Sequence, residues 1–100
     1  MRVGFDISQT GSRKAGCGFF ADGLIKALAQ LGGQNEYILY PTFGDFYFDP
    51  RVIGSRPIEQ ENIHYGLCHS SAEKAREFWC NPPDHYEMKL GSPDIIHANN

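Results

Sequence analysis

Hydrophobic and polar residues alternate at the start of the chain, and the pattern then changes to a helical period. Residues 3–7 read VGFDI, with apolar side chains at the odd positions, which is the period of a pleated strand. A polar loop over residues 8–15 follows, and a helix is predicted over residues 16–31. Its apolar residues share one face: Phe20, Leu24, Leu28 and Leu31, reinforced by Ile25 and Ala27. We expect close packing of this helix on the sheet to offset the cost of Gly23 in its interior, about 1 kcal/mol relative to alanine.

The pattern continues as a second strand and then alternates again. Gly32-Gly33 is typical of a helix end, and EYILY at residues 36–40 predicts a strand ended by Pro41. Residues 41–61 show no clear period. Four further elements are predicted: a strand over 62–67, a helix capped by Ser70 or Ser71 and ending at Cys80, a helix over 84–90, and a buried strand over 94–98.

This order of elements predicts an α/β fold with one open parallel, Rossmann-like sheet over residues 1–100. The first strand is expected in the centre, flanked by the second and the last. No helix follows the last strand, so we expect part of one sheet face to lie uncovered. That face makes self-association of the chain an expectation.

The composition and charge of the chain argue against two classes, nucleic-acid-binding and transmembrane proteins. The chain has 100 residues, 41% of them hydrophobic, and a net charge of -3, with a pI near 5.7 and a mean hydropathy of -0.41. These values argue against a nucleic-acid binder, and no apolar run approaches the roughly 20 residues of a transmembrane helix. Three cysteines without an export signal indicate a cytoplasmic protein with reduced thiols.

The loop after the first strand is the main candidate site. Gly16, Gly18 and Ala21 fit G-x-G-x-x-[G/A] at a helix start, where backbone N–H groups and the helix dipole favour an anion. Two features argue against a dinucleotide site: the glycines follow the strand by about eight residues, and no acidic residue ends the second strand. The segment from Gly11 also lacks the Lys-Ser or Lys-Thr of a P-loop. Either an anion-binding loop or a flexible loop explains these glycines.

Residues near the ends of other predicted strands are secondary candidates. His97 emerges from the last strand at the carboxyl edge of the sheet, where ligands of open α/β sheets bind; it either binds a ligand or bonds a nearby carbonyl. Asn99 suits a polar ligand or a helix cap. Asp6 is expected to accept backbone N–H bonds from the loop. The aromatic residues Phe46 and Tyr47 either stack on a sugar or a partner protein, or fold back over the core.

Histidines and cysteines in the second half of the chain do not have the spacing of a metal site. Neither a C-x-x-C nor an H-x-x-x-H pair occurs among the residues concerned, which are His64, Cys68, His69, Cys80 and His85. We therefore expect neither a metal nor another cofactor.

The two ends of the chain resemble a known family. The segments MRVGFDISQTGSRKAGCGFFADGLIKALAQLGGQNEYILYPT and SPDIIHANN look like the amino-terminal part of a group 1 glycosyltransferase, a retaining, nucleotide-sugar-dependent enzyme of the GT-B fold. The resemblance lies in the Gly16-Cys17-Gly18 helix start, in NEYILY at residues 35–40, and in DIIH at residues 94–97. It covers about the first 42 and the last 8 residues.

The resemblance implies specific roles. The chain would be part of an amino-terminal, acceptor-side domain, with the donor-binding carboxyl-terminal domain absent, so we expect the chain alone to be inactive. Gly11, Gly16 and Gly18 would lie near the donor diphosphate, and His97 would face the transferred sugar as the catalytic residue. Phe46, Tyr47 and Asn99 are acceptor-side candidates, the acceptor being a glycan or a lipid. The alternatives are a stand-alone flavodoxin-like module that binds nucleotide or phosphate without catalysis, and an interaction domain that uses the aromatic loop.

Overall fold

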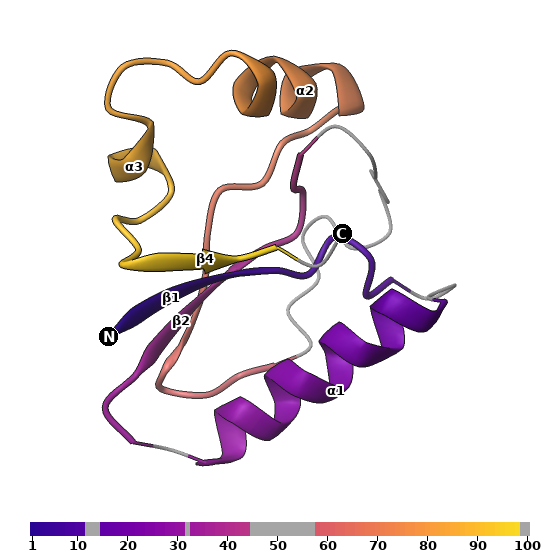
Figure 1. The fold of residues 1–100 in the computed structure, drawn as a ribbon, viewed down its shortest axis with the longest axis vertical. Coiled ribbons are helices and arrows are strands. Elements are labelled where there is room, and N and C mark those ends of the chain that lie inside the picture. Colours follow the sequence, from indigo (N-terminus) through magenta and orange to yellow (C-terminus); the bar gives the residue numbers. More distant parts are fainter. Residues whose placement is uncertain (12–14, 32, 45–57, 99–100) are drawn as a thin grey trace.

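The computed structural model is an α/β fold with helices on both faces of one parallel sheet (Figure 1). It describes residues 1–11, 15–31, 33–44 and 58–98. In chain order the elements are β1 (Arg2–Asp6), α1 (Gly16–Leu31), β2 (Glu36–Tyr40), β3 (Ile63–Tyr65), α2 (Ala72–Cys80), α3 (Tyr86–Lys89) and β4 (Ile95–His97).

The sheet has the predicted centre. Its strand order is β3-β2-β1-β4, and β1 pairs in parallel with β2 on one side and with β4 on the other. The prediction that the first strand lies between the second and the last is therefore confirmed. In register, Phe5 of β1 lies between Leu39 of β2 and His97 of β4.

Helix α1 covers one face of the sheet, but through a different side than the sequence predicts. Its bounds match the prediction, whereas its buried residues are Gly18, Ala21, Ile25 and Ala29. Phe20 is 61% exposed and Leu31 is 80% exposed, so the predicted face is wrong at both ends. Three of the four buried residues are glycine or alanine, and their small size lets the helix approach Phe5, Tyr37 and Leu39 closely.

Gly23 does not belong to that close contact. A Cβ built at Gly23 would meet no heavy atom within 4 Å, and the residue is exposed. The expectation that tight packing on the sheet offsets Gly23 is therefore wrong, because the residue faces away from the sheet.

The opposite face of the sheet holds a second, smaller core. Ile38, Tyr40 and Leu90 are buried there, and Phe43, Leu67, Phe78 and Trp79 pack around them. The Tyr40 hydroxyl donates a hydrogen bond of 2.7 Å to the buried carbonyl of Leu90. This bond ties β2 to the end of α3, which lies 50 residues later in the chain.

The two short helices on this face begin differently. Ser71 caps α2, because its hydroxyl accepts a bond of 3.2 Å from the backbone N–H of Lys74; this confirms one of the two predicted caps. The predicted helix over 84–90 is shorter, because His85 adopts a left-handed conformation with φ 61° and only Tyr86–Lys89 are helical.

Strand β4 is exposed, contrary to the prediction of a buried strand. Ile95 is 54% exposed and Ile96 is 38% exposed. The reason is topological: β4 is an edge strand, and among the described residues neither α1 nor α2 and α3 cover it (Figure 1). Within the described ranges, no helix has the length and apolarity needed to span a membrane.

Candidate functional site

The carboxyl ends of the four parallel strands define one edge of the sheet. From β1 the chain crosses to β2 through α1 on one face, and from β3 it returns to β4 through α2 and α3 on the other face (Figure 1). The order of strands therefore reverses between β1 and β4. In open α/β sheets, ligands bind in the crevice outside the carboxyl ends at such a point.

The end of β1 is held by buried polar groups. Asp6 is fully buried, and its carboxylate accepts a hydrogen bond of 2.8 Å from the backbone N–H of Ser8, which confirms the predicted bracing role. Thr10 closes the next turn, since both its backbone N–H and its hydroxyl donate to the carbonyl of Ile7, at 3.0 and 2.7 Å. The glycine loop therefore starts from a fixed turn.

One buried hydroxyl at this turn has no partner among the described residues. Ser8 is fully buried, and its Oγ makes no hydrogen bond there. A buried polar atom without a partner costs about 1–3 kcal/mol. This hydroxyl is therefore available to a ligand or to water at the carboxyl edge.

The predicted glycines lie around the start of α1. Gly11 and Gly18 are buried, and Gly16 is exposed at the first helical residue. The first turn carries no acidic side chain, so none of its own residues neutralises the positive end of the helix dipole. A Cβ at Gly16 would meet nothing within 4 Å among the described residues, so packing alone does not require glycine at this position.

His97 lies where the sequence predicts it, at the carboxyl end of β4. Its imidazole stacks on the ring of Phe5, with centroids 4.9 Å apart and planes inclined by 16°. His97 is exposed, and no hydrogen bond joins its ring nitrogens to other described residues. The stack fixes the plane of the ring beside β1 and leaves the nitrogens available to a ligand.

A second histidine, His69, also lies at this edge, although its spacing in the sequence bears only on a metal site. Thr42, fully buried just after β2, accepts a bond of 3.0 Å from the backbone N–H of His69, and its Oγ1 lies 3.2 Å from Nδ1 of the same residue. In the tautomer that carries its proton on Nε2, Nδ1 accepts the hydroxyl hydrogen of Thr42; in the other tautomer, Nδ1–H donates to Oγ1. Burial lowers the pKa of His69 below 6.5, which favours the neutral imidazole.

The sequence signal for that pair was weak. Thr42 and His69 are 27 residues apart, and neither belongs to a motif. Only the position of Thr42, directly after a buried strand, pointed to the carboxyl edge.

All three predicted acceptor-side residues, Phe46, Tyr47 and Asn99, lie outside the described residues. Within the described part of the chain, no group of three or more His, Cys, Asp or Glu side chains is arranged to hold a metal ion.

Comparison of the chain with protein-family models, with curated proteins and with solved structures gave no match. The chemistry that this site can support therefore follows from its own geometry and residues.

Proposed function

We propose that this chain forms the acceptor-side part of a retaining glycosyltransferase, which moves a sugar from a nucleotide-diphosphate sugar to an acceptor hydroxyl. One observation carries the proposal. The glycine loop leaves β1 and His97 ends β4, and these two strands are paired at the point where the strand order reverses. The two segments that carry the family resemblance are therefore adjacent in space.

The proposed roles follow from the chemistry of the donor. Breaking the bond between sugar and diphosphate leaves negative charge on the phosphate oxygens, and preorganised N–H and O–H donors stabilise that charge. The loop of Gly11, Gly16 and Gly18, the amino end of α1 and the Ser8 hydroxyl would supply such donors. His97, held flat on Phe5, would face the transferred sugar. These steps use only groups of the protein and the substrates.

The sheet order favours this proposal over a flavodoxin-like module. The order β3-β2-β1-β4 coincides with the first four strands of the dinucleotide-binding order 3-2-1-4-5-6. In the flavodoxin order 2-1-3-4-5 the third strand lies beside the first, whereas here β3 pairs with β2. We therefore include a Rossmann-like half-domain in the proposal, together with a cytoplasmic location, since nucleotide sugars are the substrates.

Binding measurements on the purified chain test the proposal. Isothermal titration with UDP, GDP, ADP and their glucose esters should show millimolar binding of one nucleoside diphosphate, with an additional gain for its sugar ester. His97→Asn should remove the gain from the sugar and retain the binding of the diphosphate. His85→Asn is the matched control, because His85 is an exposed histidine beside α3.

Two results would contradict the proposed roles of the glycine loop and His97. Equal binding of the diphosphate and its sugar ester, unchanged by His97→Asn, would favour the non-catalytic nucleotide-binding module. Absence of binding by every nucleotide at millimolar concentration would exclude a preformed donor site at this edge.

A further inference from the structure

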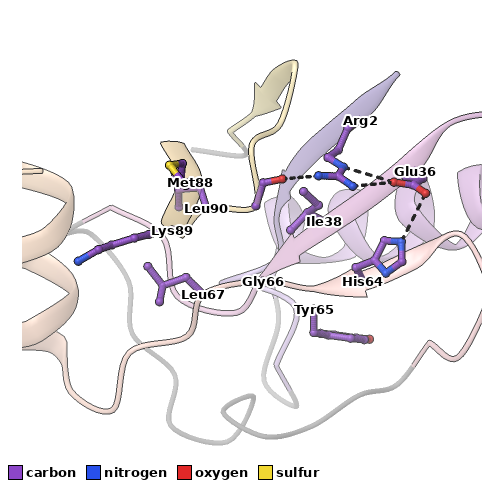
Figure 2. Close-up of a pocket in the computed structure, with 11 residues that line it drawn as sticks. Arg2, Glu36, Ile38, His64, Tyr65, Gly66, Leu67, Met88, Lys89 and Leu90 are labelled. Carbon is purple, nitrogen blue, oxygen red and sulfur yellow. Dashed lines mark hydrogen bonds and ion pairs between the residues drawn. The ribbon is translucent and has the colours of Figure 1, made fainter. Parts of the chain in front are cut away.

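A pocket lies on the face of the sheet that carries α3, and its lining extends from Arg2 and Glu36 at the amino ends of β1 and β2 to Gly66 and Leu67 just after β3 (Figure 2). Its volume is about 410 Å³, within the range of roughly 300–1,000 Å³ typical of small-molecule sites. The pocket lies between β2 and β3 on one side and the Met88–Gly91 segment on the other. Its residues do not take part in the function proposed above.

One part of the pocket wall is apolar and closely packed. Ile38 and Leu90 are 5% and 2% exposed, and Leu67 and Met88 extend the same surface. Gly66 and Gly91 keep the backbone against Ile38, since a Cβ on either would come within 2.7 or 3.0 Å of the Ile38 side chain. A bound molecule would therefore meet a fixed apolar surface.

The other part of the wall is charged. Arg2 donates from Nε and Nη2 to Oε2 of Glu36, at 3.3 and 3.2 Å, and from Nη1 to the carbonyl of Gly91 at 2.8 Å. Nε2 of His64 lies 4.0 Å from the other Glu36 oxygen. Figure 2 shows these three side chains together on one side of the pocket, with Ile38 beside them.

Arg2 has N–H donors left that could bind an anion. A guanidinium has five N–H donors, and the bonds to Glu36 and Gly91 use three of them. The two remaining donors, one on each Nη, make no hydrogen bond to described residues. The His64 imidazole is half-exposed and adds a further donor beside Arg2.

We propose that this pocket binds a small organic carboxylate, with its charged group on Arg2 and His64 and its apolar part over Ile38 and Leu90. Glu36 opposes this binding, because its carboxylate occupies two Arg2 donors and repels a second carboxylate. Glu36 and Arg2 should therefore affect binding in opposite directions, which a purely structural role of the ion pair would not produce.

Three probes of equal chain length test the proposal: hexanoate, 1-hexanol and hexylamine, each titrated into the whole chain while amide NMR signals are recorded. Hexanoate should bind tightest and shift the signals of Ile38, His64, Gly66 and Gly91. Arg2→Gln should weaken hexanoate binding by roughly tenfold, since a hydrogen bond to a charged group is lost. Glu36→Gln should strengthen it by roughly two- to fivefold.

Lys26→Gln is the matched control for charge, because Lys26 pairs with Asp22 on α1 and its loss should leave hexanoate binding unchanged. Well-dispersed amide spectra of each variant would confirm folding, and Glu36→Gln alone decides the question if Arg2→Gln does not fold. The proposal is overturned if hexylamine binds as tightly as hexanoate. It is equally overturned if Glu36→Gln fails to tighten binding, or if the shifted signals lie outside the pocket. Because none of the residues that line the pocket belongs to the glycine loop or to β4, either site can fail its test independently.

Discussion

Replacing Tyr40 with phenylalanine removes one hydroxyl from the smaller core. That hydroxyl donates 2.7 Å to the Leu90 carbonyl, and the two residues are 0% and 2% exposed. The variant leaves a buried carbonyl without its partner, so we expect it to be about 1–2 kcal/mol less stable at neutral pH. No large cavity adds to this cost, because phenylalanine keeps the ring.

The difference in stability between the wild type and Tyr40→Phe also depends on pH. Burial raises the pKa of Tyr40 from 10.0 to about 12. A raised pKa means that the stabilising contribution is complete below pH 10 and is lost as the pH rises toward 12. Each pKa unit corresponds to about 1.4 kcal/mol, so the wild type should lose roughly 2–3 kcal/mol that Tyr40→Phe does not lose. The two stability curves should therefore cross near about pH 11.

Urea unfolding followed by circular dichroism, repeated from pH 7 to pH 11.5, measures both effects. Tyr86→Phe serves as the control, since Tyr86 is 40% exposed and its hydroxyl has no partner among the described residues. A difference between wild type and Tyr40→Phe that stays constant over this pH range would refute the reasoning, as would an equal effect of Tyr86→Phe.

Two further predictions concern the glycines and the second histidine. Gly66→Ala should lower the free energy of unfolding by about 1–3 kcal/mol, because its Cβ would lie 2.7 Å from Ile38 and 2.8 Å from Tyr40. Gly23→Ala in α1 should instead raise it by up to about 1 kcal/mol. Thermal unfolding midpoints that shift in the same direction in both variants would contradict this. Burial lowers the pKa of His69, so its contribution to stability is present above pH 6.5 and is lost as the pH falls through the lowered value. Unfolding free energy between pH 7 and pH 5 should therefore fall less in His69→Gln than in the wild type, and an equal or steeper fall would contradict the assignment.

The sequence predicted the order of the sheet because its strands are short runs of β-branched and aromatic residues separated by clear helical segments. EYILY became β2, and VGFD became part of β1, which ends before Ile7. The central placement of β1 followed from the order of strands and helices, which is typical of an open α/β sheet. The carboxyl-edge position of His97 was predictable for the same reason, since it follows from the direction of β4 alone.

Side-chain burial was less predictable, because it depends on what packs against each element. In α1 the apolar residues Phe20 and Leu31 suggested one buried face, but the helix contacts the sheet through Gly18, Ala21, Ile25 and Ala29. The hydrophobic periodicity shows where the large apolar side chains lie. A helix that packs closely on a sheet, however, needs small side chains at the contact. Ile95 and Ile96 likewise read as buried, although β4 lies at the sheet edge.

The two polar pairs could not be predicted from the sequence for a different reason. Thr42 meets His69 across 27 residues, and Arg2 meets Glu36 across 34. In the sequence, each of these residues is an ordinary polar residue at the end of a predicted strand or in a loop. Only the register of neighbouring strands brings them together, and that register is a property of the folded sheet.

The most direct test of the proposed donor site is a map of amide shifts in the whole chain as UDP, GDP and ADP are added in separate titrations. The glycosyltransferase proposal predicts that one of them produces its largest shifts on Gly11, Gly16, Gly18 and His97, and that the matching nucleoside without phosphates produces none of them. Shifts confined to other residues with all three diphosphates, or the same shifts with the nucleoside, would contradict recognition of a diphosphate at the carboxyl edge of the sheet.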